Sequence, residues 1–249
     1  MLKRILWRSV FVIVTIVASL FSGISLQQRW GHAEAMPEAV AIAVTDDEVS
    51  VEDGRFLTLR PRRVAERMGL IVYPGAYTDV RGYLPTLRPI AAAGYRVVIA
   101  HMPFELAVFG IDRALEIQAA NPDVKRWALV GHSIGGTMGT LFASRNPAAL
   151  AGVIVWDAYP PSFANFPDYP QPVWLIHRAR PDGSPSPVFA AQRGEFPPEA
   201  RWVPIRGGIH MYFGSFEKGG YEEEWAPSVS REEQHAQVVR ATLDALAAM

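Results

Sequence analysis

The pattern of apolar and polar positions predicts a chain in which strands and helices alternate. Continuous apolar runs of five or six residues are typical of strands that are buried on both faces. We interpret as such strands the nearly all-apolar runs 69–73, 95–100, 126–131, 151–156, 173–177 and 201–205, with helices at roughly 81–93, 109–120 and 134–145. This alternation predicts an α/β fold, in which helices cover both faces of a mostly parallel sheet.

The two ends of this α/β region carry their own signals. Short strands are predicted at 39–44 and 49–52, and Asp53-Gly54 turns the chain back into a strand at 55–59, which makes an antiparallel hairpin. At the other end, Ser230 and Glu233 have the spacing of a capping box, so the last helix is expected to begin there.

The first 35 residues differ from the rest. Residues 9–26 form an 18-residue run without a charge, which just reaches the length of a membrane-spanning helix. Lys3, Arg4 and Arg8 precede this run, which predicts an anchor whose following body lies outside the cytoplasm. A cleaved signal segment, which would give a secreted protein, stays open because Ala33-Glu34-Ala35 has the small-x-small pattern of a cleavage site. We therefore divide the chain into an anchor or signal segment with a linker, 1–35, and one domain, 36–249.

Composition narrows the possible chemistry. The 249 residues are 49% hydrophobic and contain no cysteine, which excludes a disulfide framework, a thiolate metal site and a cysteine nucleophile. The first 35 residues carry a formal charge of +3, so −4 remains for the rest, and no basic stripe is left for nucleic acid. Any nucleophile must then be a serine, a threonine or a carboxylate.

A serine stands in the strongest motif of the sequence. Gly131-His132-Ser133-Ile134-Gly135 has the pattern G-x-S-x-G and lies where an apolar strand gives way to a helix. In a strand–turn–helix of this kind the serine backbone is strained and its hydroxyl is lifted clear of the sheet. Ser133 is therefore the predicted nucleophile.

Such a serine needs a base and an acid, which on this architecture follow in the order serine, acid, histidine. His210 lies just after the strand 201–205 and is the predicted base. His132 points away from its neighbour Ser133 and is expected to shape the pocket. The remaining candidates are out of order or out of place and are expected to be structural: His101, His177 and His235.

Two aspartates compete for the role of the acid. Asp182 follows the strand 173–177 within Pro181-Asp182-Gly183, and it is the one we favour. Asp157 follows the strand 151–156 and stays open as the alternative.

Acyl transfer also needs backbone N–H groups that stabilise a developing oxyanion. Ile134, which follows the nucleophile, is predicted to supply one of them. Ala76, in the loop after the strand 69–73, is predicted to supply the other.

Taken together these segments resemble the α/β-hydrolase superfamily, and within it the compact, dienelactone-hydrolase-like α/β-hydrolase fold-5 family. The resemblance extends from about residue 70 to the C-terminus and rests on YPGAYTD (73–79), AAAGYRVVIAHMPFELA (91–107), GHSIGG (131–136), GGIH (207–210) and SREEQ (230–234). It implies that 36–249 is the catalytic domain of a Ser-Asp-His esterase that uses neither a metal nor an organic cofactor. Because only 157–172 separates two strands where lidded relatives insert helices, no large lid domain is expected.

The function predicted is therefore hydrolysis of carboxylic esters or thioesters of small molecules through an acyl-enzyme. Alternatives are a peptidase or an acyltransferase with the same triad, or a catalytically silent hydrolase fold that serves as a binding module. The sequence names no substrate, because the fold alone does not determine it.

Overall fold

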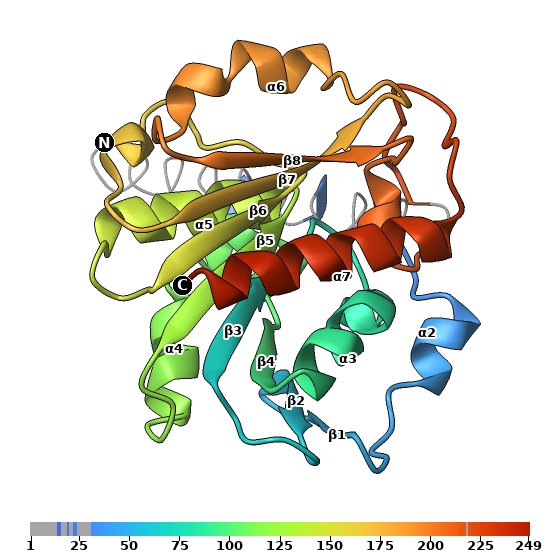
Figure 1. Ribbon diagram of the computed structural model, residues 1–249, viewed down its shortest axis with the longest axis vertical. Helices are drawn as coiled ribbons and strands as arrows, with labels where there is room; N and C mark the ends of the chain where they lie inside the picture. Colours follow the sequence, from blue (N-terminus) through green and yellow to red (C-terminus); the bar gives the residue numbers. More distant parts are fainter. Residues whose placement is uncertain (1–13, 16–18, 20–21, 24–30, 218) are drawn as a thin grey trace, which may run out of the picture.

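An eight-stranded sheet runs through the protein in the order β1-β2-β4-β3-β5-β6-β7-β8 (Figure 1). The computed structural model describes residues 14–15, 19, 22–23, 31–217 and 219–249. The strands are β1 (Val49–Asp53), β2 (Phe56–Pro61), β3 (Met68–Tyr73), β4 (Tyr95–Ala100), β5 (Trp127–His132), β6 (Gly152–Trp156), β7 (Val173–Ala179) and β8 (Arg201–Arg206). All pairs from β4 to β8 are parallel, whereas β1–β2 and β2–β4 are antiparallel. The predicted mostly parallel sheet with an N-terminal hairpin is confirmed.

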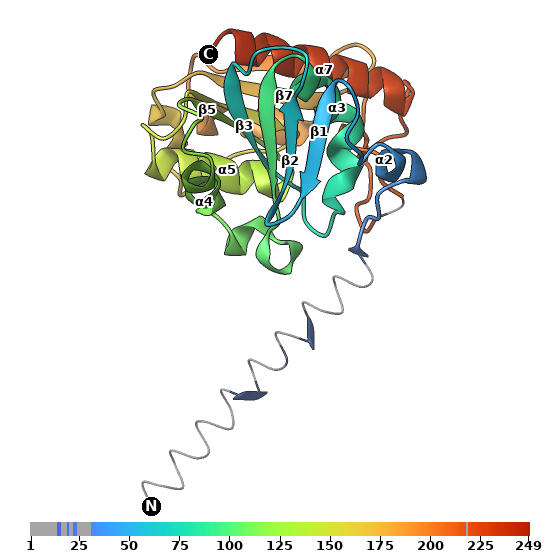
Figure 2. The same ribbon diagram turned by 90° about the horizontal axis from the view of Figure 1, so that it is seen from below.

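Helices cover both faces of this sheet, as Figures 1 and 2 show. One face carries α3 and α7, which contact each other, and the other carries α4 and α5. Their bounds are α3 (Leu84–Ala92), α4 (Arg113–Ala120), α5 (Ile134–Arg145) and α7 (Arg231–Ala247), with short helices α2 (Pro37–Ala41) and α6 (Pro187–Ala191) at the periphery. The predicted capping box is present, since Ser230 and Glu233 bond each other's backbone at the start of α7.

Alternation along the strands divides the core into two layers. In β3, Leu70 and Val72 belong to the layer under α3 and α7, whereas Ile71 and Tyr73 belong to the layer under α4 and α5. Every residue of β3 is buried. Since both faces of the central strands are covered, their sequences are nearly all apolar, which is why they could be recognised.

One predicted element is wrong. The segment 39–44 was expected to be a strand, but the chain forms α2 over Pro37–Ala41 instead. Pro37 stands at the first helical position, where its fixed φ and missing N–H favour a helix, and this local signal outweighs a short apolar run.

Between β6 and β7 the chain forms only a loop with the 3-10 turn η4 (Phe166–Asp168), so the described structure contains no lid domain at this point. Within the described part of the chain, no helix combines the length and the apolar character needed to cross a bilayer. Most of the predicted span 9–26 lies outside the described residues, which include only 14–15, 19 and 22–23 of it.

The last residues of the predicted linker contact the body. Ala33 pairs with Thr78 in the loop after β3, and Ala35 pairs with Phe216 in the segment after β8. The Ala33 N–H donates to the Tyr77 carbonyl at 2.7 Å, and the Ala33 carbonyl accepts from the Asp79 N–H at 3.0 Å. The division at residue 35 stays a prediction, but residues 33 and 35 are buried against the domain.

Candidate active site

Ser133 occupies a strained turn between β5 and α5. Its backbone has φ 55° and ψ −130°, in the region that residues with side chains rarely adopt. Two glycines make the turn possible, because a Cβ on Gly131 would lie against the Gly135 carbonyl and one on Gly135 against the Tyr73 carbonyl. The Ser133 N–H is held by the Trp156 carbonyl at 3.1 Å. The strained serine conformation predicted from G-x-S-x-G is therefore present.

His210 lines the same pocket as Ser133 and contacts a buried aspartate. Gly207, at φ 73°, turns the chain after β8, and His210 and Ser133 line the same pocket of about 250 Å³. His210 Nδ1 lies 2.6 Å from Asp157 Oδ2. Since an ionised carboxylate only accepts, Nδ1 carries the proton in this contact, and Nε2 is left as the nitrogen that can take another.

The aspartate in contact with the histidine is Asp157, so the expectation that Asp182 would hold it is wrong. Asp182 lies in an exposed turn, where its carboxylate accepts from Ser184 N at 2.9 Å and Ser184 Oγ at 2.7 Å. The Pro-Asp-Gly sequence thus forms a local Asx-type turn in which the Asp182 carboxylate bonds to Ser184. Asp157 follows β6 directly, at φ 49°, and its side chain is fully buried.

Arg178, a residue that the sequence reasoning missed, completes the contacts of the acid. Its backbone N–H donates to Asp157 Oδ1 at 2.8 Å, and its guanidinium donates to Oδ2, the oxygen that also contacts His210. Burial by itself raises the pKa of Asp157, but the hydrogen bond from His210 and the charges of His210 and Arg178 outweigh it and lower the pKa to about 2. The lowered pKa favours the ionised form of the Asp157 carboxyl.

The His210 ring is held between two other rings. Tyr221 stacks on it with ring centroids 4.0 Å apart, and His132 lies at 4.5 Å. The Glu223 carboxylate accepts from the N–H groups of His210 at 3.0 Å and Met211 at 2.7 Å.

Two residues of the acidic run Glu222-Glu223-Glu224 bond to groups of the site. Glu223 holds the backbone at His210, and Glu224 accepts from Arg178 at 2.7 Å and from Ser186 Oγ at 2.8 Å. These carboxylates therefore support the histidine and the arginine rather than only facing water.

His132 shapes the site, as predicted, and does so through Tyr83. The Tyr83 hydroxyl accepts from the Gly75 N–H at 2.9 Å and is hydrogen-bonded to His132 Nδ1 at 2.8 Å. Burial holds the pKa of His132 well below its ordinary value, and the nearby charge of His210 adds to this. A neutral His132 thus links the loop after β3 to the nucleophile turn.

Each of the two predicted oxyanion residues lines a pocket together with Ser133. Ala76 lines the pocket with Ser133 and His210, and Ile134 lines a second pocket with Ser133, Asp157 and Arg178. Ile134 is also the first residue of α5, where helix geometry leaves the N–H without an intrahelical partner. Their positions are compatible with the predicted role.

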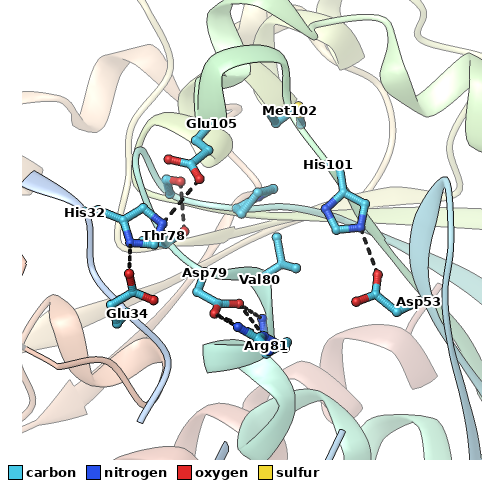
Figure 3. A pocket seen from close by; sticks show the side chains of 12 residues that line it. His32, Glu34, Asp53, Thr78, Asp79, Val80, Arg81, His101, Met102 and Glu105 are labelled. Carbon is cyan, nitrogen blue, oxygen red and sulfur yellow. Dashed lines mark hydrogen bonds and ion pairs between the residues drawn. The ribbon is translucent and has the colours of Figure 1, made fainter. Parts of the chain in front are cut away.

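A neighbouring pocket of about 390 Å³ shares Gly75 and Thr78 with the site. In it His32 lies between Glu34 and Glu105, at 3.2 and 3.3 Å, and His101 contacts Asp53 at 3.3 Å (Figure 3). Among the described residues, no group of three or more His, Cys, Asp or Glu side chains is arranged to hold a metal ion.

With this geometry in place, the comparisons with known proteins identify the family. The model of the alpha/beta hydrolase family matches residues 69–236, so the chain belongs to that family, and its expected place among hydrolase enzymes is confirmed at this level. The comparison with curated protein sequences gave no match.

Solved structures show the same fold at low identity. A protein of Thermoplasma acidophilum, described as a predicted CIB-like hydrolase, has a TM-score of 0.58 at 16% identity, over 81% of this chain and 100% of that one. A carboxylesterase of Bacillus subtilis has 0.57 at 11%, over 85% and 95%. A ferulic acid esterase of Streptomyces cinnamoneus has 0.54 at 18%, over 74% and 67%. At these identities the likeness supports the fold alone.

Proposed function

We propose that the protein hydrolyses carboxylic esters or thioesters of small molecules, with Ser133 as nucleophile, His210 as base and Asp157 as acid. One observation carries the proposal: the buried 2.6 Å contact between His210 and Asp157, in the pocket where Ser133 stands on its strained turn. Two of the structurally similar proteins are named as esterases, which agrees with this class of reaction.

The chemistry follows from the positions of these groups. His210 Nε2 takes the proton of Ser133 Oγ as the oxygen attacks the ester carbonyl, and Asp157 stabilises the imidazolium that forms. The negative oxygen of the tetrahedral intermediate accepts from the N–H groups of Ile134 and Ala76. Collapse of the intermediate expels the alcohol, which receives the proton from His210, and water then releases the acid from the serine by the same steps in reverse.

We further propose that residues 9–26 anchor this domain in a membrane, with the body outside the cytoplasm. The charge-free run and the preceding Lys3, Arg4 and Arg8 support this.

The test of the reaction compares wild type with Ser133→Ala. Losing the nucleophile of such a triad costs on the order of a million-fold in turnover, whereas the fold is expected to be unchanged. A fluorophosphonate probe should label wild type only, and p-nitrophenyl esters of increasing chain length, peptides and acyl-CoA thioesters would define the substrate class. Without labelling or turnover of wild type the fold would serve as a binding module, and turnover of peptides alone would make it a peptidase.

A further inference from the structure

Residue 31, where the continuous described part of the chain begins, lies at the candidate site. Gly31 and Ala33 line the pocket together with Ser133 and His210. His32 contacts Glu105 in the 3-10 turn η2 (Pro103–Glu105), which Figure 3 shows, and the Tyr77 N–H donates to the Glu105 carbonyl at 3.0 Å. Residue 31 is thus fixed beside the catalytic groups, at the edge of the sheet where the parallel strands end.

The distance from this rim to the predicted membrane span is short. The charge-free run ends at Leu26, five residues before Gly31. Five residues reach at most about 18 Å even when fully extended. The headgroup layer outside the hydrocarbon is itself about 5–7 Å thick. A chain anchored through 9–26 therefore holds the mouth of the pocket close to the bilayer surface.

The same side of the protein displays apolar side chains. Phe104 in η2 is 42% exposed, and Val108 and Phe109 in the neighbouring turn η3 (Ala107–Phe109) are 41% and 51% exposed. Figure 2 shows these turns and the chain at residues 31–35 on the same side of the body. We call Phe104, Val108 and Phe109 the apolar rim.

The backbone under the apolar rim is strained. Phe104 and Glu105 have φ values of 54° and 57°, although neither is a glycine. Consecutive residues with side chains adopt this conformation only where the surroundings impose it, and such strain gathers at functional segments. Here His32 contacts Glu105, and Phe104 is exposed.

We propose that the apolar rim rests on the lipid bilayer, so that the active site opens toward the membrane and takes esters that partition into it. The inference deepens the proposed function, because it rests on ester hydrolysis at Ser133 and on the anchor. The lipid surface it fits is a neutral one, since the neighbouring pocket is lined by one guanidinium, Arg81, and by four carboxylates: Glu34, Asp53, Asp79 and Glu105. Phosphatidylcholine vesicles are therefore the appropriate probe.

The absence of cysteine allows a direct test of this contact with the full chain. In the first variant, Phe109→Cys, a polarity-sensitive fluorophore is attached within the apolar rim. In the matched control, Lys125→Cys, the same fluorophore is attached to an exposed position just before β5, where the parallel strands begin. In vesicles that contain nitroxide-labelled phosphatidylcholine, we expect at least about twofold stronger quenching at position 109 than at 125, because interfacial side chains reach the acyl boundary.

A second measurement tests the substrate class. In the full chain, Phe104→Asn with Phe109→Ser should lower kcat/KM for p-nitrophenyl palmitate held in vesicles on the order of tenfold, because two half-exposed rings no longer contact lipid. Soluble p-nitrophenyl acetate should be hydrolysed at the wild-type rate. Leu115→Gln, which removes an equally exposed apolar side chain on α4, should change neither rate.

The outcomes separate the two proposals. If wild type hydrolyses neither ester, the proposed function fails. If it hydrolyses acetate but the label at position 109 is not quenched, or the chain does not associate with vesicles, the membrane contact is refuted. Shielding of that label without lipid, together with a doubled mass, would instead assign the apolar rim to a second copy of the chain.

Discussion

The acid of the triad can be tested by exchanging Asp157 and, separately, Asp182 for asparagine. Asparagine keeps the shape of the side chain but offers one acceptor oxygen instead of two. At position 157 three donors converge: Arg178 N on Oδ1, and the Arg178 guanidinium and His210 Nδ1 on Oδ2. Whichever way the amide turns, its NH₂ group faces a donor.

The two orientations set the range of the expected loss. With the amide NH₂ toward His210, Nδ1 must accept and the proton moves to Nε2, the wrong tautomer, which costs about 10⁴-fold in turnover in the serine protease that serves as the usual reference. With the oxygen toward His210 the tautomer survives, but a charged hydrogen bond becomes neutral and loses about half its strength, roughly 1–1.5 kcal/mol or about tenfold. Asp157→Asn should therefore lose between about 10- and 10⁴-fold in turnover.

Asp182→Asn is the matched control. Its amide oxygen can still accept from Ser184 N in an exposed turn, so turnover should stay within about twofold of wild type. Both variants are assayed on p-nitrophenyl acetate, with the active fraction counted by fluorophosphonate labelling and the fold checked by circular dichroism. A larger loss in Asp182→Asn than in Asp157→Asn would refute this assignment of the acid.

Two further predictions concern stability. Gly135→Ala should lower the free energy of unfolding by at least about 2 kcal/mol in urea, because the new Cβ meets the Tyr73 carbonyl, whereas Gly194→Ala, with open space around its Cβ, should change it by less than about 1 kcal/mol. The pKa of Asp157 is lowered from its ordinary 3.8 to about 2. Its contribution, on the order of 2 kcal/mol, should be present above pH 4 and lost as the pH falls toward 2, and this part of the loss should be missing in Asp157→Asn. Equal acid sensitivity of the two proteins would contradict the lowered pKa.

Most of the sheet could be predicted because its strands are buried on both faces. The run 95–100 is apolar except for Arg96, and β4 has those bounds. Likewise Asp53-Gly54 marked the hairpin, and Ser230 with Glu233 marked the start of α7. The exception is 39–44, where an apolar run of six residues outside the central sheet carried too little information to tell a strand from α2.

The site could be predicted only as far as local geometry determines it. Ser133 and Ile134 follow from one glycine-rich turn, and His210 follows from its place after β8. The acid depends on which strand end lies nearest the imidazole, which no local pattern shows. One signal was available: Arg178 lies near the end of β7, and a buried guanidinium needs a carboxylate partner such as Asp157, which directly follows the adjacent strand β6.

Residues 33–35 contact two segments next to the candidate site, so the N-terminal segment and the site are linked. The predicted cleavage pattern, Ala33-Glu34-Ala35, lies inside this contact, where Ala33 bonds both sides of Thr78 and Glu34 accepts from the Glu217 N–H at 2.8 Å. A chain cut after residue 35 would lose both connections, one to the loop that carries Ala76 and one to the segment that follows His210. Retention of this segment therefore supports the loops of the catalytic site as well as the proposed attachment to a membrane.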